Sequence, residues 1–201
     1  MPKKILQKEE KVLRQVAKEI PISKIQTPQV KKILQEMKSA LKSQDDGVAI
    51  AAPQIGYSLR IFVVSGKIFN EDFLGQGLSQ ADEQADEPRG SAVSPDTDSD
   101  PEQENSLKKK TMKDLVFINP KISKLSRDKE WLPEGCLSVR PFYGKTWRSK
   151  KATVTAYDEN GKKFERGGSG LLAQIFQHET DHLNGILFID HAKDVKAEEI
   201  K

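Results

Sequence analysis

The chain has 201 residues, 36% of them hydrophobic, and a net charge of +3. That length fits one domain with a single core, and no apolar run approaches the ~18 residues that cross a bilayer. One cysteine excludes an internal disulfide and suits a reducing cytosol, so we expect a cytoplasmic protein without a membrane partner.

The first long helix is expected over residues 27–44. Thr27 is a suitable cap and Pro28 suits the first turn. Apolar residues then recur at helical spacing, which predicts a face that covers the core: Val30, Ile33, Leu34, Met37, Ala40 and Leu41.

Small residues dominate the segment from Asp46 to Gly56, which Pro53 interrupts. This composition favours a strand or loop whose backbone another group can approach closely. A buried strand is predicted next, from Leu59 to Val64.

Acidic residues are concentrated in one segment. Residues 71–104 hold eleven Asp or Glu and one basic residue, whereas the rest of the chain carries 32 basic and 19 acidic residues. We predict a disordered acidic insertion at about 70–110 within a single catalytic domain, 1–201. The basic remainder indicates a solvated surface, or else a weak preference for polyanions such as ribosomal RNA. No interleaving of aromatic and basic residues along the sequence supports that second interpretation.

Strands are expected again in the second half of the chain. Residues 115–120 and 122–125 are predicted as two short strands, and 151–157 alternates like a half-buried strand. The turn signal at 158–161 predicts a hairpin whose second strand runs through Phe164.

The last helix is predicted over 169–183, with Ser169 as its cap, a stop at Asn184-Gly185 and a short strand over 186–189. The expected fold class is α+β, with antiparallel β-sheets wrapped around this central helix.

This helix carries the pattern H-E-x-x-H. His178 and His182 are four residues apart, so both lie on one helical face and can bind one metal ion. Glu179 is placed where a carboxylate can take a proton from water bound to that metal. Buried polar groups without partners cost several kcal/mol, and a metal would supply the partner.

Two histidines leave the site short of a ligand. His191 does not fall at the spacing of a third histidine, and too few residues follow for a downstream glutamate. Cys136, which follows Gly135 among polar neighbours, is therefore the candidate third ligand. The alternatives for Cys136 are a small buried hydrophobe or a nucleophile paired with histidine.

These residues, taken with two further motifs, resemble the peptide deformylases. The motif G-x-G-L-A-A-x-Q corresponds to residues 47–54, E-G-C-L-S to 134–138, and Q-H-E-x-D-H-x-x-G to 177–185. The second and third motifs are intact, and the resemblance extends over nearly the whole chain apart from the acidic segment.

The resemblance implies a metal-dependent hydrolase that removes the formyl group from formyl-methionine at the start of nascent polypeptides, releasing formate. It implies Cys136, His178 and His182 as metal ligands and Fe(II) as the ion, which Zn, Ni or Co replaces. Glu179 would transfer the proton, while the backbone N–H of Leu137 and the side chain of Gln54 would stabilise the developing oxyanion.

The substrate would lie as an extended strand beside the first motif. Gly47 and Ala49 are its expected backbone partners, and Val48 and Ile175 the lining of the methionine pocket. Nascent formyl-Met peptides are the expected partner. The resemblance also allows transient association with the ribosome, and no specific DNA binding is expected.

The chain departs from the family pattern at four places, one of which is Ile50 in place of leucine. Ala49 replaces a glycine, which would matter if that position required a positive φ. Gln174 stands where the family often has arginine, and Arg140 where proline is common.

Two other functions compete with deformylation. A zincin-like peptidase would need the downstream ligand that is missing here. A binding module that retained its metal without turnover would be expected to lack Glu179, which is present.

Overall fold

The computed structural model describes residues 2–70 and 112–197. The predicted acidic insertion, from 71 onward, therefore lies outside the described residues. Among those described, no helix is both long and apolar enough to cross a membrane.

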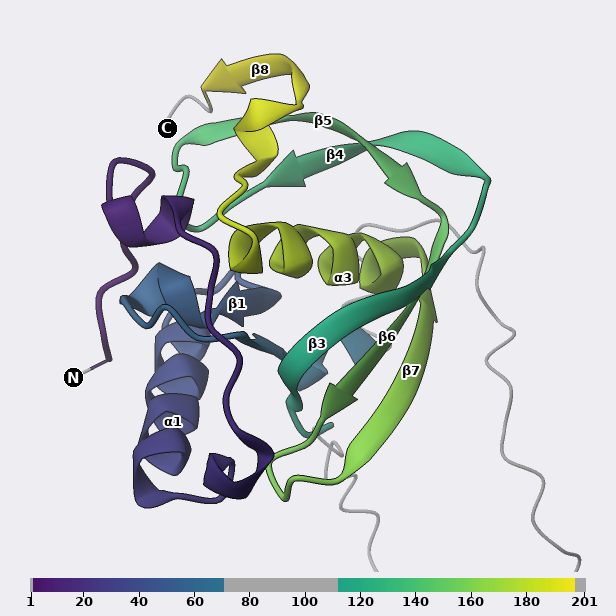
Figure 1. The fold of residues 1–201 in the computed structure, drawn as a ribbon. Helices are drawn as coiled ribbons and strands as arrows, with labels where there is room; N and C mark the ends of the chain where they lie inside the picture. The colour runs from purple at the N-terminus through teal and green to yellow at the C-terminus, as the bar shows by residue number, and fades with distance from the viewer. Residues whose placement is uncertain (1, 71–111, 198–201) are drawn as a thin grey trace, which may run out of the picture.

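The fold consists of two antiparallel sheets with a long helix between them (Figure 1). The five-stranded sheet has the order β1-β2-β3-β6-β7, built from Ala49–Ala51, Ile61–Val64, Leu115–Leu125, Lys151–Tyr157 and Lys163–Ser169. The three-stranded sheet has the order β4-β5-β8, built from Lys129–Gly135, Phe142–Ser149 and Lys193–Ala197. The long helices are α1, Pro28–Lys42, and α3, Gly170–Leu183. The predicted α+β class is confirmed.

Short 3-10 helices connect these elements. They are η1 at Lys11–Arg14, η2 at Ile22–Lys24, η3 at Ala52–Ile55, η4 at Gly66–Phe69 and η5 at Phe188–Asp190.

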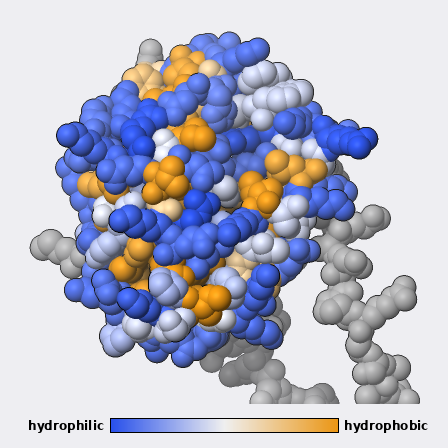
Figure 2. Space-filling view, in the orientation of Figure 1, coloured by the Kyte–Doolittle hydropathy of each residue, from blue (hydrophilic) through white to orange (hydrophobic). Residues whose placement is uncertain are grey.

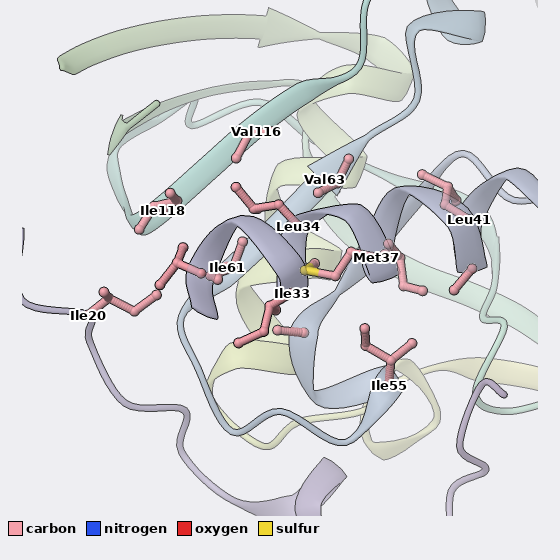
Figure 3. Packing of buried hydrophobic residues seen from close by; sticks show 14 of the residues in the cluster. Ile20, Ile33, Leu34, Met37, Leu41, Ile55, Ile61, Val63, Val116 and Ile118 are labelled. Atoms are coloured by element: carbon pink, nitrogen blue, oxygen red, sulfur yellow. The ribbon is translucent and has the colours of Figure 1, made fainter. Parts of the chain in front are cut away.

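Strand β2 is buried along its whole length because both faces of its sheet are covered. Ile61 and Val63 point to the α1 side, where they pack with Leu34 and Met37 (Figure 3). Phe62 points to the α3 side, where it belongs to a second cluster. Each fully buried side chain of this size contributes about 1.5–3 kcal/mol.

Aromatic rings fix α3 against the larger sheet. The Phe62 and Phe117 rings stack with centroids 4.5 Å apart, and the Phe176 ring meets Phe117 edge-on at 5.3 Å. Because Phe176 precedes the histidine motif on α3, this packing sets how that motif faces the opposite sheet.

The structure corrects several boundaries. Residues 115–125 form one strand, not two, with register shifts against β6 and a positive φ at Asn119. The Asn119 amide explains this bend, because it exchanges hydrogen bonds of 2.8 and 2.7 Å with the backbone of Ile20. Residues 188–190 are a 3-10 helix, so the predicted strand over 186–189 is wrong.

Thr27 and Ser169 occupy the predicted N-cap positions, but neither side chain makes a capping hydrogen bond. Thr27 precedes α1, but its hydroxyl donates backward to the Lys24 carbonyl. Ser169 precedes α3, and its side chain makes no cap hydrogen bond.

The whole β4-β5-β8 sheet was absent from the sequence prediction. Its strands contain Pro133, Gly135 and Gly144, residues that normally weaken a strand assignment. Cross-strand pairing from Lys129–Ser149 to Gly135–Tyr143 nevertheless forms without a break.

Candidate active site

Helix α3 places both histidines toward the smaller sheet. The ring centroids of His178 and His182 lie 4.9 Å apart, as their spacing predicts. Gln177 fixes the helix at this level, since its side-chain amide both accepts from and donates to the backbone of Ser149, each at 2.9 Å.

Cys136 follows the end of β4 and meets these histidines. Its sulfur lies 3.2 Å from Nε2 of His182, and the backbone N–H of Ser138 points to it at 3.4 Å. One donor atom from each of Cys136, His178 and His182 lies within 4.8 Å of the others. Among the described residues this is the cluster able to hold a metal ion, and it is the predicted set.

A buried charge network supports His178. Nδ1 of His178 lies 2.7 Å from Oε1 of Glu134, which leaves the other ring nitrogen facing the cluster. Arg148 holds the same carboxylate through Nε at 3.0 Å and Nη2 at 2.7 Å, and Thr146 donates to it at 2.6 Å. Arg148 also bonds Asp181 at 2.6 Å. Partners of this kind orient metal-binding histidines and raise their basicity.

Electrostatics favour a cation here. Burial opposes the charged form of Glu134, but the hydrogen bonds from His178 and Arg148 outweigh it and lower the pKa of this carboxyl. Burial likewise opposes the cationic form of His178, yet Cys136 and Glu134 raise its pKa well above the usual range. The surroundings of His178 therefore stabilise a positive charge.

The residues present fit a divalent metal ion. A thiolate and two imidazoles form a ligand set suited to Fe(II), Co(II), Ni(II) or Zn(II). Burial lowers the pKa of His182 well below its usual value, which favours the neutral imidazole that binds a metal. The pKa of His178 is raised instead, so a metal ion bound there would displace a proton. Nδ1 of His182 and Oε2 of Glu179 are buried without a hydrogen-bond partner, so the site has polar capacity left over.

Glu179 is 3% exposed and adjacent to the cluster. Burial raises its pKa to about 7, although nearby His178 acts in the opposite direction. A carboxyl whose pKa lies near neutrality can both accept and return a proton under cellular conditions.

Gln54 is buried rather than an exposed amide. Its Oε1 accepts from the Ala51 N–H at 2.7 Å, and its Nε2 donates to the Ser138 hydroxyl at 3.1 Å and lies 3.7 Å from the Cys136 sulfur. An amide nitrogen carries two hydrogens, and here one is directed to the Ser138 hydroxyl and the other to the Cys136 sulfur at the edge of the cluster.

A cleft of about 670 Å³ opens over this cluster. Its lining brings together every predicted site residue except His182: Gly47, Val48, Ala49, Gln54, Cys136, Leu137, Ile175, His178 and Glu179. His182 lies beneath, 1% exposed.

Strand β1 borders this cleft as the edge strand of its sheet. Ala49 pairs with Val64 of β2, and the positive-φ non-glycine residues of the described chain are Asn119 and Asp194. Ala49 is therefore unstrained. Gly47 is needed for packing, because a Cβ there would lie 3.0 Å from Gln44 and 3.1 Å from Leu41.

Polar residues form the outer rim. Arg140 pairs with Asp46 at 2.5 Å across exposed surface, and Gln174 donates to the Pro133 carbonyl at 2.9 Å. Arg140 and Gln174, two of the departures from the family pattern, thus lie in the cleft lining.

Glu134 and Arg148 are functional residues that sequence reasoning missed. Glu134 appeared only as a motif letter, although an acidic residue beside a candidate ligand was a usable signal. Arg148 gave no signal, since its position depends on the β4–β5 pairing that was not predicted.

Comparison with known proteins is consistent with this geometry. Residues 2–198 match the family model described as polypeptide deformylase. A peptide deformylase of Carboxydothermus hydrogenoformans is 32% identical over 96% of this chain and 94% of its own length. Peptide deformylase 1 of Pseudomonas syringae is 48% identical over a shorter stretch, 43% of this chain and 52% of that protein.

Among solved structures, a class I type b peptide deformylase of Acinetobacter baumannii with bound Met-Ala-Ser is similar in fold. It is 25% identical, with a TM-score of 0.69, covering 95% of this chain and 99% of that one. The resemblance drawn from the three motifs is confirmed: the chain belongs to the polypeptide deformylase family.

Proposed function

We propose that this protein removes the N-terminal formyl group from formyl-methionine peptides and releases formate. The observation that carries the proposal is the position of Glu179, a buried carboxyl with an unpaired oxygen beside a Cys-His-His cluster, at the base of a cleft bordered by an edge strand. The Met-Ala-Ser bound to the Acinetobacter relative is a peptide of the class that such a reaction leaves behind.

Cys136, His178 and His182 would hold the metal ion, with Fe(II) as the native ion and Zn, Ni or Co as substitutes. When bound, such an ion lowers the pKa of water and polarises a carbonyl oxygen. The thiolate supports this choice, because soft sulfur favours these ions over Mg²⁺ or Ca²⁺.

Glu179 moves the proton. Its carboxylate accepts a proton from the attacking water and later returns it to the amine that leaves as the formyl C–N bond breaks. The pKa of about 7 suits both directions of transfer. Burial also keeps bulk water from competing for that proton.

Gln54 and Leu137 stabilise the charge that develops on the formyl oxygen. The Gln54 amide N–H that is directed at the Cys136 sulfur and the backbone N–H of Leu137 are the donors, both in the cleft lining. Donors already fixed in place need no reorganisation as charge develops, which makes them effective. The Ala51 and Ser138 bonds fix the Gln54 amide in this way.

The peptide lies along β1. An edge strand offers unpaired backbone groups to an added strand, which favours an extended substrate beside Gly47 and Ala49. Val48 and Ile175 line the methionine pocket. Both are apolar and border the cleft, as this assignment requires.

The setting we propose is cytoplasmic processing of nascent chains during protein biosynthesis, with transient ribosome association. We also propose that residues 1–201 act as one catalytic domain and that 71–110 are dispensable for turnover. The flanks support this, since the Gly66 N–H donates to Asp114 at 3.0 Å and so brings the two ends together. Replacing 71–110 by a short Gly-Ser linker should preserve turnover; collapse of folding or activity would refute dispensability.

The direct test is formate release from formyl-Met-Ala-Ser by protein loaded anaerobically with Fe(II). Acetyl-Met-Ala-Ser, which adds one methyl group, is the matched control and should yield no acetate. Cleavage of an internal peptide bond instead would support the zincin-like peptidase. No release from protein with one metal per chain would support the binding module.

A further inference from the structure

The β4-β5-β8 sheet has one face against α3 and another that faces away from it (Figure 1). Side chains alternate between the faces of a strand. Glu134, Thr146 and Arg148 point inward and are buried, so residues at odd offsets from them point outward. Within this surface we call the following the outer face: Lys129, Trp131, Lys145 and Trp147, together with Lys193, which pairs with Lys145 in the register.

Both tryptophans of the chain lie on this outer face. Trp131 and Trp147 are register partners on β4 and β5, with ring centroids 5.3 Å apart, and remain 41% and 49% exposed. Large apolar rings that lie together on the surface are typical of an interaction site. Neither ring lines the catalytic cleft.

Lysines surround the tryptophan pair. Lys193 lies over the Trp131 ring, with Nζ 4.5 Å from the centroid. Lys193 also stands opposite Lys145 in the β5–β8 register, and like charges in that position destabilise a sheet. Asp194 offsets Lys145 only loosely, at 3.8 Å between exposed groups. An anion bound across this row would offset the repulsion.

We propose that the outer face binds single-stranded RNA. Bases stack on exposed aromatic rings, while lysines beside them contact phosphates, and every base offers a ring face whatever the sequence. The register supplies both requirements side by side: a tryptophan pair in one row and a lysine pair two residues along β5. The linear sequence conceals this pattern because the residues come from three strands.

Two other anionic partners fit the observations less well. An acidic peptide would use the lysines but gain little from paired indole rings. A membrane-binding surface also combines lysine with tryptophan, but it needs a broad apolar face to enter the lipid. The outer face offers two rings with a lysine over one of them, which is what base stacking requires. On the face drawn in Figure 2, hydrophobic patches are separated by hydrophilic surface.

Intrinsic tryptophan fluorescence tests the proposal directly, because both tryptophans report on the outer face. Titrating the metal-loaded protein with a short oligouridylate at low salt should quench the emission to saturation. Trp147→Ala should weaken binding of labelled oligouridylate roughly 5- to 150-fold by anisotropy, and Trp147→Phe, which keeps a stacking ring, should restore much of it.

The lysines are tested through salt. Lys145→Ala with Lys193→Ala should reduce the slope of log affinity against log salt by about 0.7 for each phosphate that is no longer neutralised. The matched control is Lys31→Ala with Lys162→Ala, exposed lysines on α1 and the β6–β7 turn, which should leave the slope unchanged. Unchanged formate release by Trp147→Ala would show that the fold is intact.

Three results would overturn the proposal. The first is absence of quenching by oligouridylate at low salt. The second is equal competition by polyglutamate with no effect of Trp147→Ala, which would show charge attraction without stacking. The third is a blue shift of the tryptophan emission with phosphatidylserine vesicles, together with no change in the emission on adding RNA. That result would identify a membrane surface instead.

Discussion

Two arginine–carboxylate pairs border the same cleft and differ in their surroundings. Arg148 and Glu134 lie at its inner end with side chains 7% and 4% exposed, whereas Arg140 and Asp46 lie at the rim, 47% and 71% exposed. Through Glu134 the inner pair contacts His178, one of the proposed metal ligands. The rim pair meets water on several sides.

This difference separates two tasks. The side chains of Glu134, Arg148 and His178 are largely buried and connected by hydrogen bonds, so that a change in one disturbs the others. The Arg140–Asp46 pair can change without disturbing the cluster, which agrees with the departure from the family pattern at Arg140. Gln174 differs, because it also donates to the Glu134 carboxylate at 3.3 Å. Retained chemistry and a varied cleft edge are therefore compatible.

Paired arginine substitutions should show the largest contrast. Arg148→Met leaves the Glu134 carboxylate buried without its cation, which should cost about 3–5 kcal/mol of unfolding free energy. Arg140→Met should cost about 0–1 kcal/mol, because exposed pairs contribute little. Urea unfolding of the metal-free proteins measures both losses of unfolding free energy. Equal losses would contradict the distinction between the inner pair and the rim pair.

Gln54→Leu extends the contrast to turnover. Loss of an oxyanion donor should lower kcat by about 10²–10³-fold with a small change in KM. Arg140→Met, a change at the exposed rim, should act mainly on KM. Steady-state formate release from formyl-Met-Ala-Ser distinguishes the two, and a Gln54→Leu enzyme with normal kcat would exclude the assigned role.

Glu134→Gln should weaken metal binding by about 10–100-fold, because the neutral amide supports the His178 imidazole less well. Glu130→Gln is the control on the same strand, as Glu130 pairs with exposed Lys150 at 3.7 Å. Competition with a chelator gives both affinities. Equal affinities would mean that Glu134 serves packing alone.

The smallest effect is expected at an exposed pair remote from the cleft. Burial opposes the charge of Asp190, but the bond from Arg14 and the Leu187 N–H outweigh it and lower its pKa below 3.8. A carboxyl with a lowered folded-state pKa stabilises the protein above pH 3.8 and loses that contribution as the pH falls through the folded value. Asp190→Asn should therefore cost less than about 1 kcal/mol at pH 7.

Urea unfolding of Asp190→Asn and the wild type across pH measures this contribution. The difference between them should shrink below pH 3.8. A difference that grew in acid would show the opposite sign of linkage.

The sequence predicted the parts of the site whose spacing is local or which belong to a recognisable motif. His178, Glu179 and His182 share a helix, so periodicity placed them together, and Cys136 and Gln54 were carried by motifs. The support around His178 was not predictable in this way. Glu134 and Arg148 meet only because β4 and β5 pair, and those strands contain proline and glycine, which obscure the strand pattern.

The outer face escaped prediction for the same reason. Trp131, Trp147 and Lys193 are brought together by cross-strand register, which no local pattern reveals. Burial of Gln54 likewise depends on Ser138, 84 residues away in sequence. Local motifs could be identified from the sequence, whereas the pairing of strands distant in the sequence could be identified only from the structure.

The most direct test of the proposed division of roles compares metal content and formate release in the same preparation of Glu179→Gln. We expect one metal ion per chain, as in the wild type, with formate release lowered by about 10²–10⁴-fold. This outcome would show that Glu179 is needed for turnover and not for holding the ion, as expected if Cys136, His178 and His182 are the ligands. Turnover near the wild-type rate, or absence of the metal from the variant, would contradict that division of roles.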